Sequence, residues 1–196
     1  MPLLEMNGIT KYFPGVVAND HVSFDLEAGE VHALVGENGA GKTTLMNILY
    51  GLYRPDAGSI SIRGRETAMR SPRDAIDHGI GMVHQHFMLI PVFTVLENIV
   101  LGEETHRFGV LRLEEPARKI RGIMESSNLS VELGARIEEL PVGVQQRVEI
   151  LKVLYRGAEI LVFDEPTASL TPQETSELFK TFLQMKKQGR GFFGLA

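Results

Sequence analysis

Short apolar runs separated by longer amphipathic stretches run along most of the chain. Residues 31–35, 81–83 and 160–163 are almost wholly apolar, which is typical of strands buried in a parallel sheet. Residues 59–62 alternate between polar and apolar positions, as a strand at a sheet edge does. The run at 160–163 ends in two carboxylates, and this pattern indicates a central strand.

Helices are predicted between these strands. Residues 42–50, 94–101 and 114–127 have helical apolar spacing, and a long polar helix ends near residue 188. Ser71, followed by Pro72 and Asp74, has the pattern of a helix start, and Thr171 opens the last helix by the same logic. Strands that alternate with helices predict an α/β fold. The mostly helical stretch 88–156 is expected to form a lobe of its own.

Composition narrows the possible partners and compartments. The chain has 196 residues, which suits one domain, and its formal net charge of −5 argues against nucleic acid as the main partner. It has no cysteine, so disulfides are excluded and an intracellular compartment fits. We expect no signal peptide and no transmembrane segment, because no apolar run approaches the roughly 20 residues that span a bilayer.

The clearest chemical motif is G-x-x-x-x-G-K-T at residues 36–43, placed between a predicted strand and a predicted helix. Its glycines let backbone N–H groups converge on phosphate, and the helix N-terminus adds positive dipole there. Lys42 is expected to reach the β- and γ-phosphates of a nucleotide, and the Thr43 hydroxyl to ligate Mg²⁺. The predicted phosphate-binding residues are Gly36, Glu37, Asn38, Gly39, Ala40, Gly41, Lys42, Thr43 and Thr44.

Two carboxylates supply the second half of the predicted site. Asp164 and Glu165 follow the strand at 160–163, and such positions face the ligand crevice of an open α/β sheet. Asp164 is expected to hold Mg²⁺ through water, and Glu165 to activate the attacking water as general base.

Together these motifs resemble the ABC (ATP-binding cassette) ATPases over essentially the whole chain. Asp164-Glu165-Pro166-Thr167 matches the extended Walker B motif of that family, and Gln85 stands where the family has its Q-loop glutamine. The resemblance implies that Gln85 contacts Mg²⁺ together with Thr43 and Asp164, and that Gln85 and Glu165 serve catalysis. Phe13 matches the aromatic residue that stacks on adenine, with Tyr12 as the alternative.

The resemblance also implies an architecture. It predicts a P-loop NTPase with a RecA-like parallel core, an N-terminal antiparallel β subdomain and a helical subdomain. We expect one ABC ATPase domain over residues 1–196, with 1–87 and 157–196 in the core and 88–156 in the helical subdomain. The chain stops before the family's γ-phosphate-contacting histidine, which implies a C-terminally truncated cassette.

The signature segment departs from the family pattern. The family's Leu-Ser-Gly-Gly-Gln grips ATP bound to an opposite subunit, and its counterpart here begins at Leu140. Proline in place of the signature serine has neither a hydroxyl nor a backbone N–H to offer, so closure on a partner's ATP is expected to be poor. Thr171 replaces the usual D-loop aspartate, and a helix-capping role competes evenly with a functional one there. The predicted signature residues are Pro141, Val142, Gly143, Val144 and Gln145.

Residues 89–99 resemble the importer branch of the family, and the chain is similar to the first cassette of tandem ATPases that serve sugar and nucleoside importers. This implies transmembrane permease subunits and a second ABC ATPase domain as partners. It also implies a cytoplasmic protein held at the inner face of the membrane through the permease.

Rival functions remain open at this point. A nucleotide-dependent binding module with little turnover fits the altered signature, and for the isolated chain it is favoured over robust catalysis. A soluble ABC ATPase of translation or DNA repair fits less well, because this compact acidic chain lacks long insertions and a basic surface. A GTPase fits least, since no Asn-Lys-x-Asp guanine-reading motif occurs.

Overall fold

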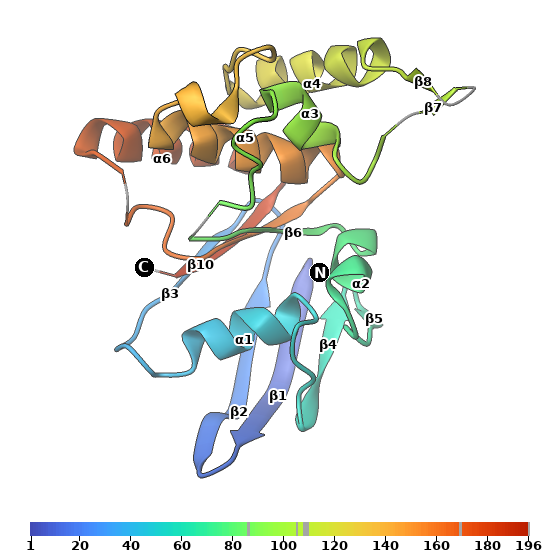
Figure 1. Ribbon diagram of the computed structural model, residues 1–196. Helices are drawn as coiled ribbons and strands as arrows, with labels where there is room; N and C mark the ends of the chain where they lie inside the picture. Colours follow the sequence, from blue (N-terminus) through green and yellow to red (C-terminus); the bar gives the residue numbers. More distant parts are fainter. Residues whose placement is uncertain (86, 105, 108–109, 169, 196) are drawn as a thin grey trace.

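Two sheets and a layer of helices build the molecule in the computed structural model (Figure 1). The structure describes residues 1–85, 87–104, 106–107, 110–168 and 170–195. The first sheet is antiparallel, in the order β2-β1-β4-β5, and the second is parallel, in the order β3-β10-β9-β6. The fold is therefore mixed α/β, with a parallel sheet and a separate antiparallel sheet, as predicted.

The antiparallel sheet comes from the N-terminal part of the chain. Its long strands β1 and β2 pair over most of their length, and β4 adds to the other edge of β1. The alternating pattern at 59–62 predicted only the last part of β4, and the expected antiparallel subdomain carried no ranges for the two long strands. The strands are β1 (Leu4–Phe13), β2 (Val16–Leu26), β4 (Ala57–Ile62) and β5 (Arg65–Glu66).

The parallel sheet holds the strands that end at the candidate site. Its members are β3 (Val31–Leu34), β6 (Ile80–Val83), β9 (Ile160–Phe163) and β10 (Gly191–Leu195). The central placement of β9 is confirmed, since it lies between β10 and β6. The expectation of a buried β3 is wrong: β3 pairs with β10 at the end of the sheet order, and Val31 and Ala33, which share one face of the strand, are exposed.

Strand β9 serves two hydrophobic cores, because successive side chains of a strand point to opposite faces. Ile160 and Val162 pack with the antiparallel sheet and helix α1 (Lys42–Leu49). Leu161 and Phe163 pack with the helical layer on the other face. The strand is therefore fully buried, and the residues that follow it are held from both sides.

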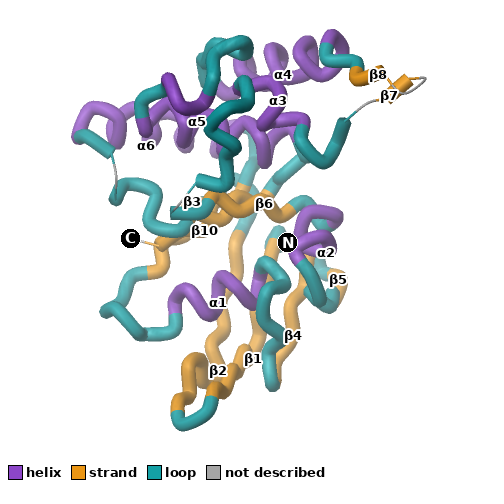
Figure 2. The backbone as a smooth tube through the Cα atoms, in the orientation of Figure 1, coloured by secondary structure: helices purple, strands orange, loops and turns teal. Residues whose placement is uncertain are grey.

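The helical layer covers one face of the parallel sheet, and α1 with the antiparallel sheet lies on the opposite side (Figures 1 and 2). The core of this layer is continuous with β9 and β10, so the stretch 88–156 shares its apolar interior with the sheet. The remaining elements are α2 (Pro72–Asp77), α3 (Val95–Val100), β7 (His106–Arg107), β8 (Val110–Leu111), α4 (Glu114–Ser127), η1 (Ile137–Glu139), α5 (Val142–Tyr155) and α6 (Pro172–Lys187).

The predicted helix starts are found where the polar residues indicated them. Ser71 accepts a hydrogen bond from the Asp74 N–H at 3.3 Å and caps α2. Thr171 and Glu174 form a complete capping box on α6, and an equivalent box at Thr94 and Glu97 opens α3. These caps satisfy N–H groups that a helix end otherwise leaves without partners.

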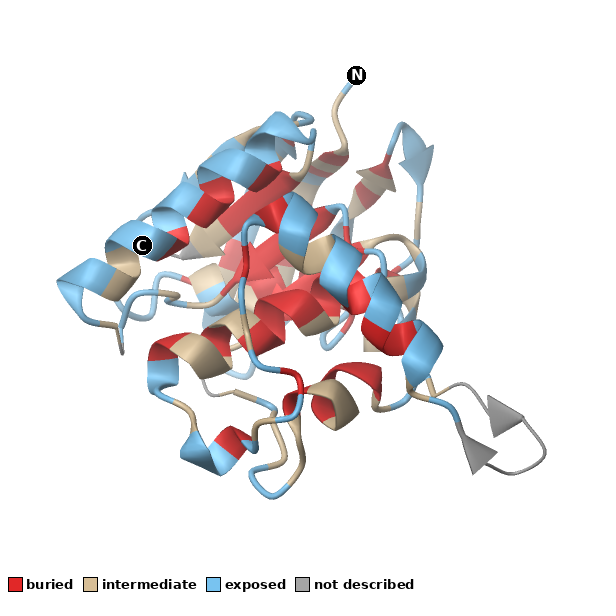
Figure 3. Cartoon of the chain, turned by 90° about the horizontal axis from the view of Figure 1, so that it is seen from above, coloured by how far each residue is buried: buried red, intermediate tan, exposed pale blue. Residues whose placement is uncertain are grey.

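Buried residues gather in the interior, and exposed ones cover the outward helix faces (Figure 3). Within the described part of the chain, no helix has the length and apolar character needed to cross a membrane.

Candidate functional site

The predicted phosphate loop and the predicted adenine-stacking residue share one cavity. This cavity has a volume of about 360 Å³ and lies between the end of β1, the start of β2 and the N-terminus of α1. Its lining brings together residues that are far apart in sequence: Phe13, Val16, Ala18, Asn38, Gly39, Ala40, Gly41, Lys42, Thr43, Thr44 and Glu165. Most of the predicted phosphate-binding residues are therefore in one place.

Glycine is required in this loop for two different reasons. Gly39 and Gly41 have φ of 86° and 83°, a left-handed backbone that favours glycine. At Gly41 a Cβ would also fall 1.9 Å from the Ala18 carbonyl oxygen, whereas at Gly39 it would meet nothing within 4 Å. The antiparallel strand β2 thus packs directly against the loop at Gly41.

The Lys42 ammonium group lies within the loop that precedes it. Its Nζ donates to the carbonyl oxygens of Gly36 at 2.5 Å and Glu37 at 3.1 Å. These contacts turn the side chain back over the start of α1, where a phosphate attracted by the helix dipole would be bound. Gly36 and Glu37 do not line the cavity themselves, and they contribute through these carbonyls.

Glu165 projects into the same cavity from the end of β9. Its backbone has a φ of 46°, which is uncommon for a residue other than glycine and marks local strain. Its carboxylate accepts a hydrogen bond from the Gln85 side-chain amide at 3.2 Å. The structure therefore joins the two predicted catalytic residues, which come from the segments that follow β9 and β6.

Asp164 lies one residue before Glu165, at the end of the buried strand. Its backbone N–H donates to the Val83 carbonyl oxygen at 3.1 Å, which fixes β9 against β6. Burial raises the pKa of the Asp164 carboxyl, the neighbouring Glu165 carboxylate adds to the rise, and His84 opposes it. A bound cation would offset the cost of keeping the Asp164 carboxylate charged, because an opposite charge nearby favours the ionised form.

Phe13 is the aromatic residue that faces the cavity. Its ring packs edge-on against Tyr53 at a centroid distance of 5.5 Å, and the Lys11 ammonium lies 5.7 Å from its centroid. Tyr12 is 53% exposed and does not line the cavity, since neighbours along a strand point to opposite faces. The geometry therefore favours Phe13 over Tyr12 for stacking.

Two contributors to this site were missed from the sequence. The Asn19 side chain is buried and its Nδ2 donates to the Gly41 carbonyl oxygen at 3.1 Å. Tyr53, from the turn after α1, supports Phe13. A polar residue inside a strand pattern was a signal for Asn19, but it does not reveal which loop the side chain contacts.

The predicted signature residues lie apart from this cavity. None of residues 141–145 is among the cavity's lining residues, and Pro141 stands at the N-cap of α5 with no side-chain cap hydrogen bond. The Gln145 amide donates to the Ile137 and Leu140 carbonyls, at 3.3 and 2.9 Å. Within one chain the segment therefore does not reach the phosphate loop.

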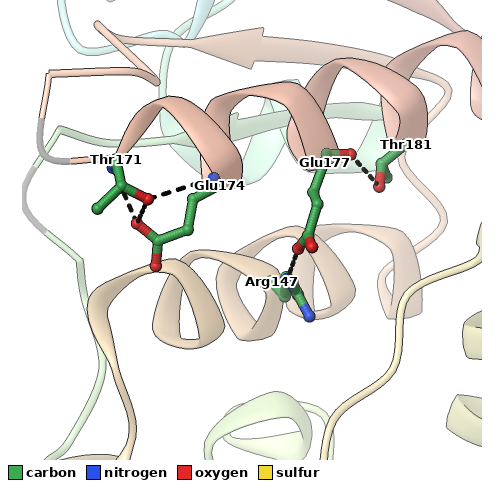
Figure 4. Close-up of polar contacts among 5 residues, drawn as sticks. All are labelled: Arg147, Thr171, Glu174, Glu177 and Thr181. Atoms are coloured by element: carbon green, nitrogen blue, oxygen red, sulfur yellow. Dashed lines mark hydrogen bonds and ion pairs between the residues drawn. The ribbon is translucent and has the colours of Figure 1, made fainter.

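The start of α5 contacts the start of α6. A Cβ at Gly143 would fall 2.3 Å from the Glu174 carboxylate, so glycine allows this close approach. The Thr171 N–H and hydroxyl lower the pKa of Glu174, and the Gly143 N–H adds a smaller effect. One turn later, Arg147 forms an ion pair with Glu177 (Figure 4). The capping role weighed for Thr171 is thus realised in the structure.

The donor set fits a nucleotide with Mg²⁺. A cradle of backbone amides, one ammonium and an aromatic face matches the phosphates and base of a nucleotide. In the described residues no three His, Cys, Asp or Glu side chains gather as a metal site. Mg²⁺ in phosphate-transfer sites is commonly held by one or two carboxylates together with substrate phosphates, and Asp164 with Thr43 suits that arrangement.

Comparisons with known proteins agree with this chemistry. Residues 19–168 match the ABC transporter family. The chain is 50% identical over 188 residues to the guanosine import ATP-binding protein NupO of Bacillus subtilis, covering 96% of this chain and 37% of that protein. It is 48% identical over 190 residues to the ribose import ATP-binding protein RbsA 1 of Rubrobacter xylanophilus, covering 97% and 38%.

A solved structure supports the same fold. The crystal structure of the ADP conformation of an ATP-binding cassette of an ABC transporter superposes with a TM-score of 0.89 at 29% identity, covering 100% of this chain and 81% of that one. The chain therefore spans most of a cassette, and little more than a third of the length of the curated relatives described above.

Proposed function

Since the chain belongs to the ABC transporter family of ATP-binding proteins, we propose that it binds and hydrolyses ATP as part of an importer. The observation that carries the proposal is the single cavity that joins Phe13, the phosphate loop and Glu165. These are the groups needed for a base, a triphosphate and an attacking water.

Nucleotide binding rests on the loop and its support. The backbone amides of residues 38–44 and the Lys42 ammonium hold the phosphates, and Phe13 stacks on the base. The ammonium exchanges its contacts with the Gly36 and Glu37 carbonyls for contacts with phosphate oxygens. Gly36 and Glu37 therefore belong to the proposed site through their backbone.

The metal role is assigned to Thr43, Gln85 and Asp164. When bound, Mg²⁺ neutralises charge that develops on the phosphate oxygens. The Thr43 hydroxyl and the Gln85 side-chain oxygen would hold it together with phosphate, and Asp164 would hold it through water. The charged form of Asp164 is disfavoured by its burial and by Glu165, and the cation offsets that cost.

Hydrolysis is assigned to Glu165 with Gln85. The Glu165 carboxylate accepts a proton from the water that attacks the γ-phosphorus, while the bond from that phosphorus to the leaving ADP oxygen breaks. Gln85 orients the carboxylate through its amide. Because the Gln85 segment leads into the helical layer, the same contact connects the nucleotide site to the rest of the transporter.

The partners follow from the geometry and from the relatives. The predicted signature residues Pro141, Val142, Gly143, Val144 and Gln145 do not reach the phosphate loop of their own chain, which supports a role on the ATP of a second cassette. Relatives named as guanosine and ribose import proteins support a nucleoside or sugar as the solute. We place the chain at the cytoplasmic face of a membrane, on permease subunits.

A binding module with little turnover is the less favoured function, because the relatives described above are named as import ATP-binding proteins. The two functions are separated by measuring ATP binding and phosphate release on the parent and on Glu165→Gln. The importer ATPase predicts unchanged ATP affinity and a loss of phosphate release of roughly 10²- to 10⁴-fold in the variant, the contribution of a general base. Equal phosphate release by both proteins contradicts the assignment of Glu165.

A further inference from the structure

Gln146 is a buried polar residue on α5 to which the proposed hydrolysis assigns no role. Its side chain is 4% exposed, and its Nε2 donates a hydrogen bond to the Pro166 carbonyl oxygen at 2.7 Å. A side-chain amide is buried at a cost unless it is hydrogen-bonded, so this contact defines how α5 meets the loop after β9.

Pro166 directly follows Glu165, and this makes its carbonyl important. Proline has no N–H, so its carbonyl is the single hydrogen-bonding group of its backbone. Glu165 itself has a left-handed backbone with a φ of 46°, which persists only where surrounding contacts hold it. The Gln146 amide provides such a contact immediately after the strained residue.

The same helix also contacts the segment that follows Gln85, the other residue of the catalytic pair. The Lys152 ammonium donates to the Met88 carbonyl oxygen at 2.9 Å, three residues after Gln85. The Lys152 side chain is 11% exposed, although Met88 itself is exposed. Helix α5 is thereby fastened to both segments whose side chains meet in the Gln85–Glu165 hydrogen bond.

We propose that Gln146 is a positioning residue, which sets the backbone of Glu165 by fixing the Pro166 carbonyl. The proposal rests on the proposed function, in which Glu165 is the general base. Gln146 touches neither the nucleotide cavity nor its loop, so its effect reaches the reaction only through the position of Glu165.

The test compares Gln146→Met with the parent chain. Methionine has nearly the same length and volume, fits an apolar surrounding and removes the donor. The control is Gln188→Met, because the exposed Gln188 amide also donates to a backbone carbonyl, that of Ser126, and neither residue lines the nucleotide cavity. Gln146→Asn is the second variant, since it keeps the amide but is one methylene too short to span the contact.

The first readout is hydrogen exchange of the amides in residues 164–168, which needs no nucleotide. The loss of one neutral hydrogen bond is expected to shift the local opening equilibrium of this loop roughly fivefold. Gln146→Met and Gln146→Asn are therefore expected to raise exchange there by about fivefold, with the rest of the sheet unchanged. An unchanged rate at 164–168, or an equal rise in Gln188→Met, overturns the proposal.

The second readout separates positioning from a general loss of structure. Phosphate release per bound ATP is expected to fall by roughly fivefold in Gln146→Met, with the dissociation constant for ATP within about twofold of the parent. A matching loss of ATP affinity overturns the positioning role. A parent chain that binds no ATP contradicts the proposed function instead, and the exchange comparison still decides the role of Gln146.

Discussion

The Gln85 side-chain amide donates to the Glu165 carboxylate at 3.2 Å, although 80 positions separate the two residues in sequence. Strands β6 and β9 run parallel and side by side, so the segments that follow them leave the same edge of the sheet. One of these residues opens the connection to the helical layer and the other lines the nucleotide cavity. This contact therefore joins the segment that leads to the helical layer with the nucleotide cavity.

Alanine substitutions at the two left-handed glycines of the phosphate loop should destabilise the fold by different amounts. Gly39→Ala introduces left-handed strain of about 1 kcal/mol into the folded state. Gly41→Ala has the same strain and in addition places a Cβ against the Ala18 carbonyl oxygen, so we expect a loss above about 2 kcal/mol. Urea unfolding of both variants measures the difference. Equal losses in the two would show that β2 does not constrain the loop.

Phe13 should contribute to ATP affinity and Tyr12 should not. Stacking of an aromatic side chain on a base is worth about 1–3 kcal/mol, so Phe13→Ala is expected to raise the dissociation constant by roughly 5- to 150-fold. Tyr12→Ala is the matched control, because its side chain does not line the cavity. A titration with a fluorescent ATP analogue measures both. A larger effect at Tyr12 would reverse the assignment.

Asp164→Asn should stabilise the chain when no metal is bound. Burial, with a further contribution from Glu165, raises the pKa of this carboxyl. The folded state therefore binds the Asp164 proton more tightly than the unfolded chain does, and the charged form opposes folding above the raised pKa. We expect a higher Tm for Asp164→Asn at pH 7, and a difference that disappears below about pH 3.9, the ordinary pKa of Asp. A lower Tm for the variant at pH 7 would contradict this account.

The capping box of α6 should make a pH-dependent contribution to stability. Thr171→Ala is expected to lower the free energy of unfolding by about 1 kcal/mol at pH 7. The Thr171 N–H and hydroxyl lower the pKa of Glu174, so this stabilisation is present above the ordinary Glu pKa of about 4.3 and is lost as pH falls through the lowered value.

Urea unfolding at pH 7 and below pH 4 checks this prediction, because the cost of Thr171→Ala should shrink at acid pH. Ser176→Ala is the control within the same helix, since its hydroxyl donates only to the Pro172 carbonyl at 2.9 Å. A cost of Thr171→Ala that is the same at both pH values would exclude the contacts to the Glu174 carboxylate as its source.

Local chemistry explains what could be predicted from the sequence. The loop at 36–43 and the carboxylates after β9 are each specified by neighbouring residues, and the polar starts of α2 and α6 are local as well. The central position of β9 followed from its unbroken apolar run, because both faces of such a strand must be covered. These elements needed no knowledge of the tertiary structure.

Contacts between distant segments could not be predicted in this way. Asn19 and Gln146 occur in an ordinary strand and an ordinary helix, and their partners are carbonyls of other segments. The exposure of Val31 and Ala33 on β3 was also missed, because what covers the face of a strand depends on distant segments rather than on the apolar residues at 31–35. A polar residue within an apolar pattern indicates a buried hydrogen bond, but it does not identify the residue that accepts it.

The central claim is that the cavity at the phosphate loop binds ATP with Mg²⁺. The most direct test is the thermal unfolding of the parent chain and of Lys42→Ala, each with and without ATP·Mg²⁺. At a ligand concentration 100 times the dissociation constant, binding stabilises the folded state by about 2.7 kcal/mol. We predict a rise in Tm for the parent and almost none for Lys42→Ala. An unchanged Tm for the parent, or an equal rise in both proteins, would contradict the account.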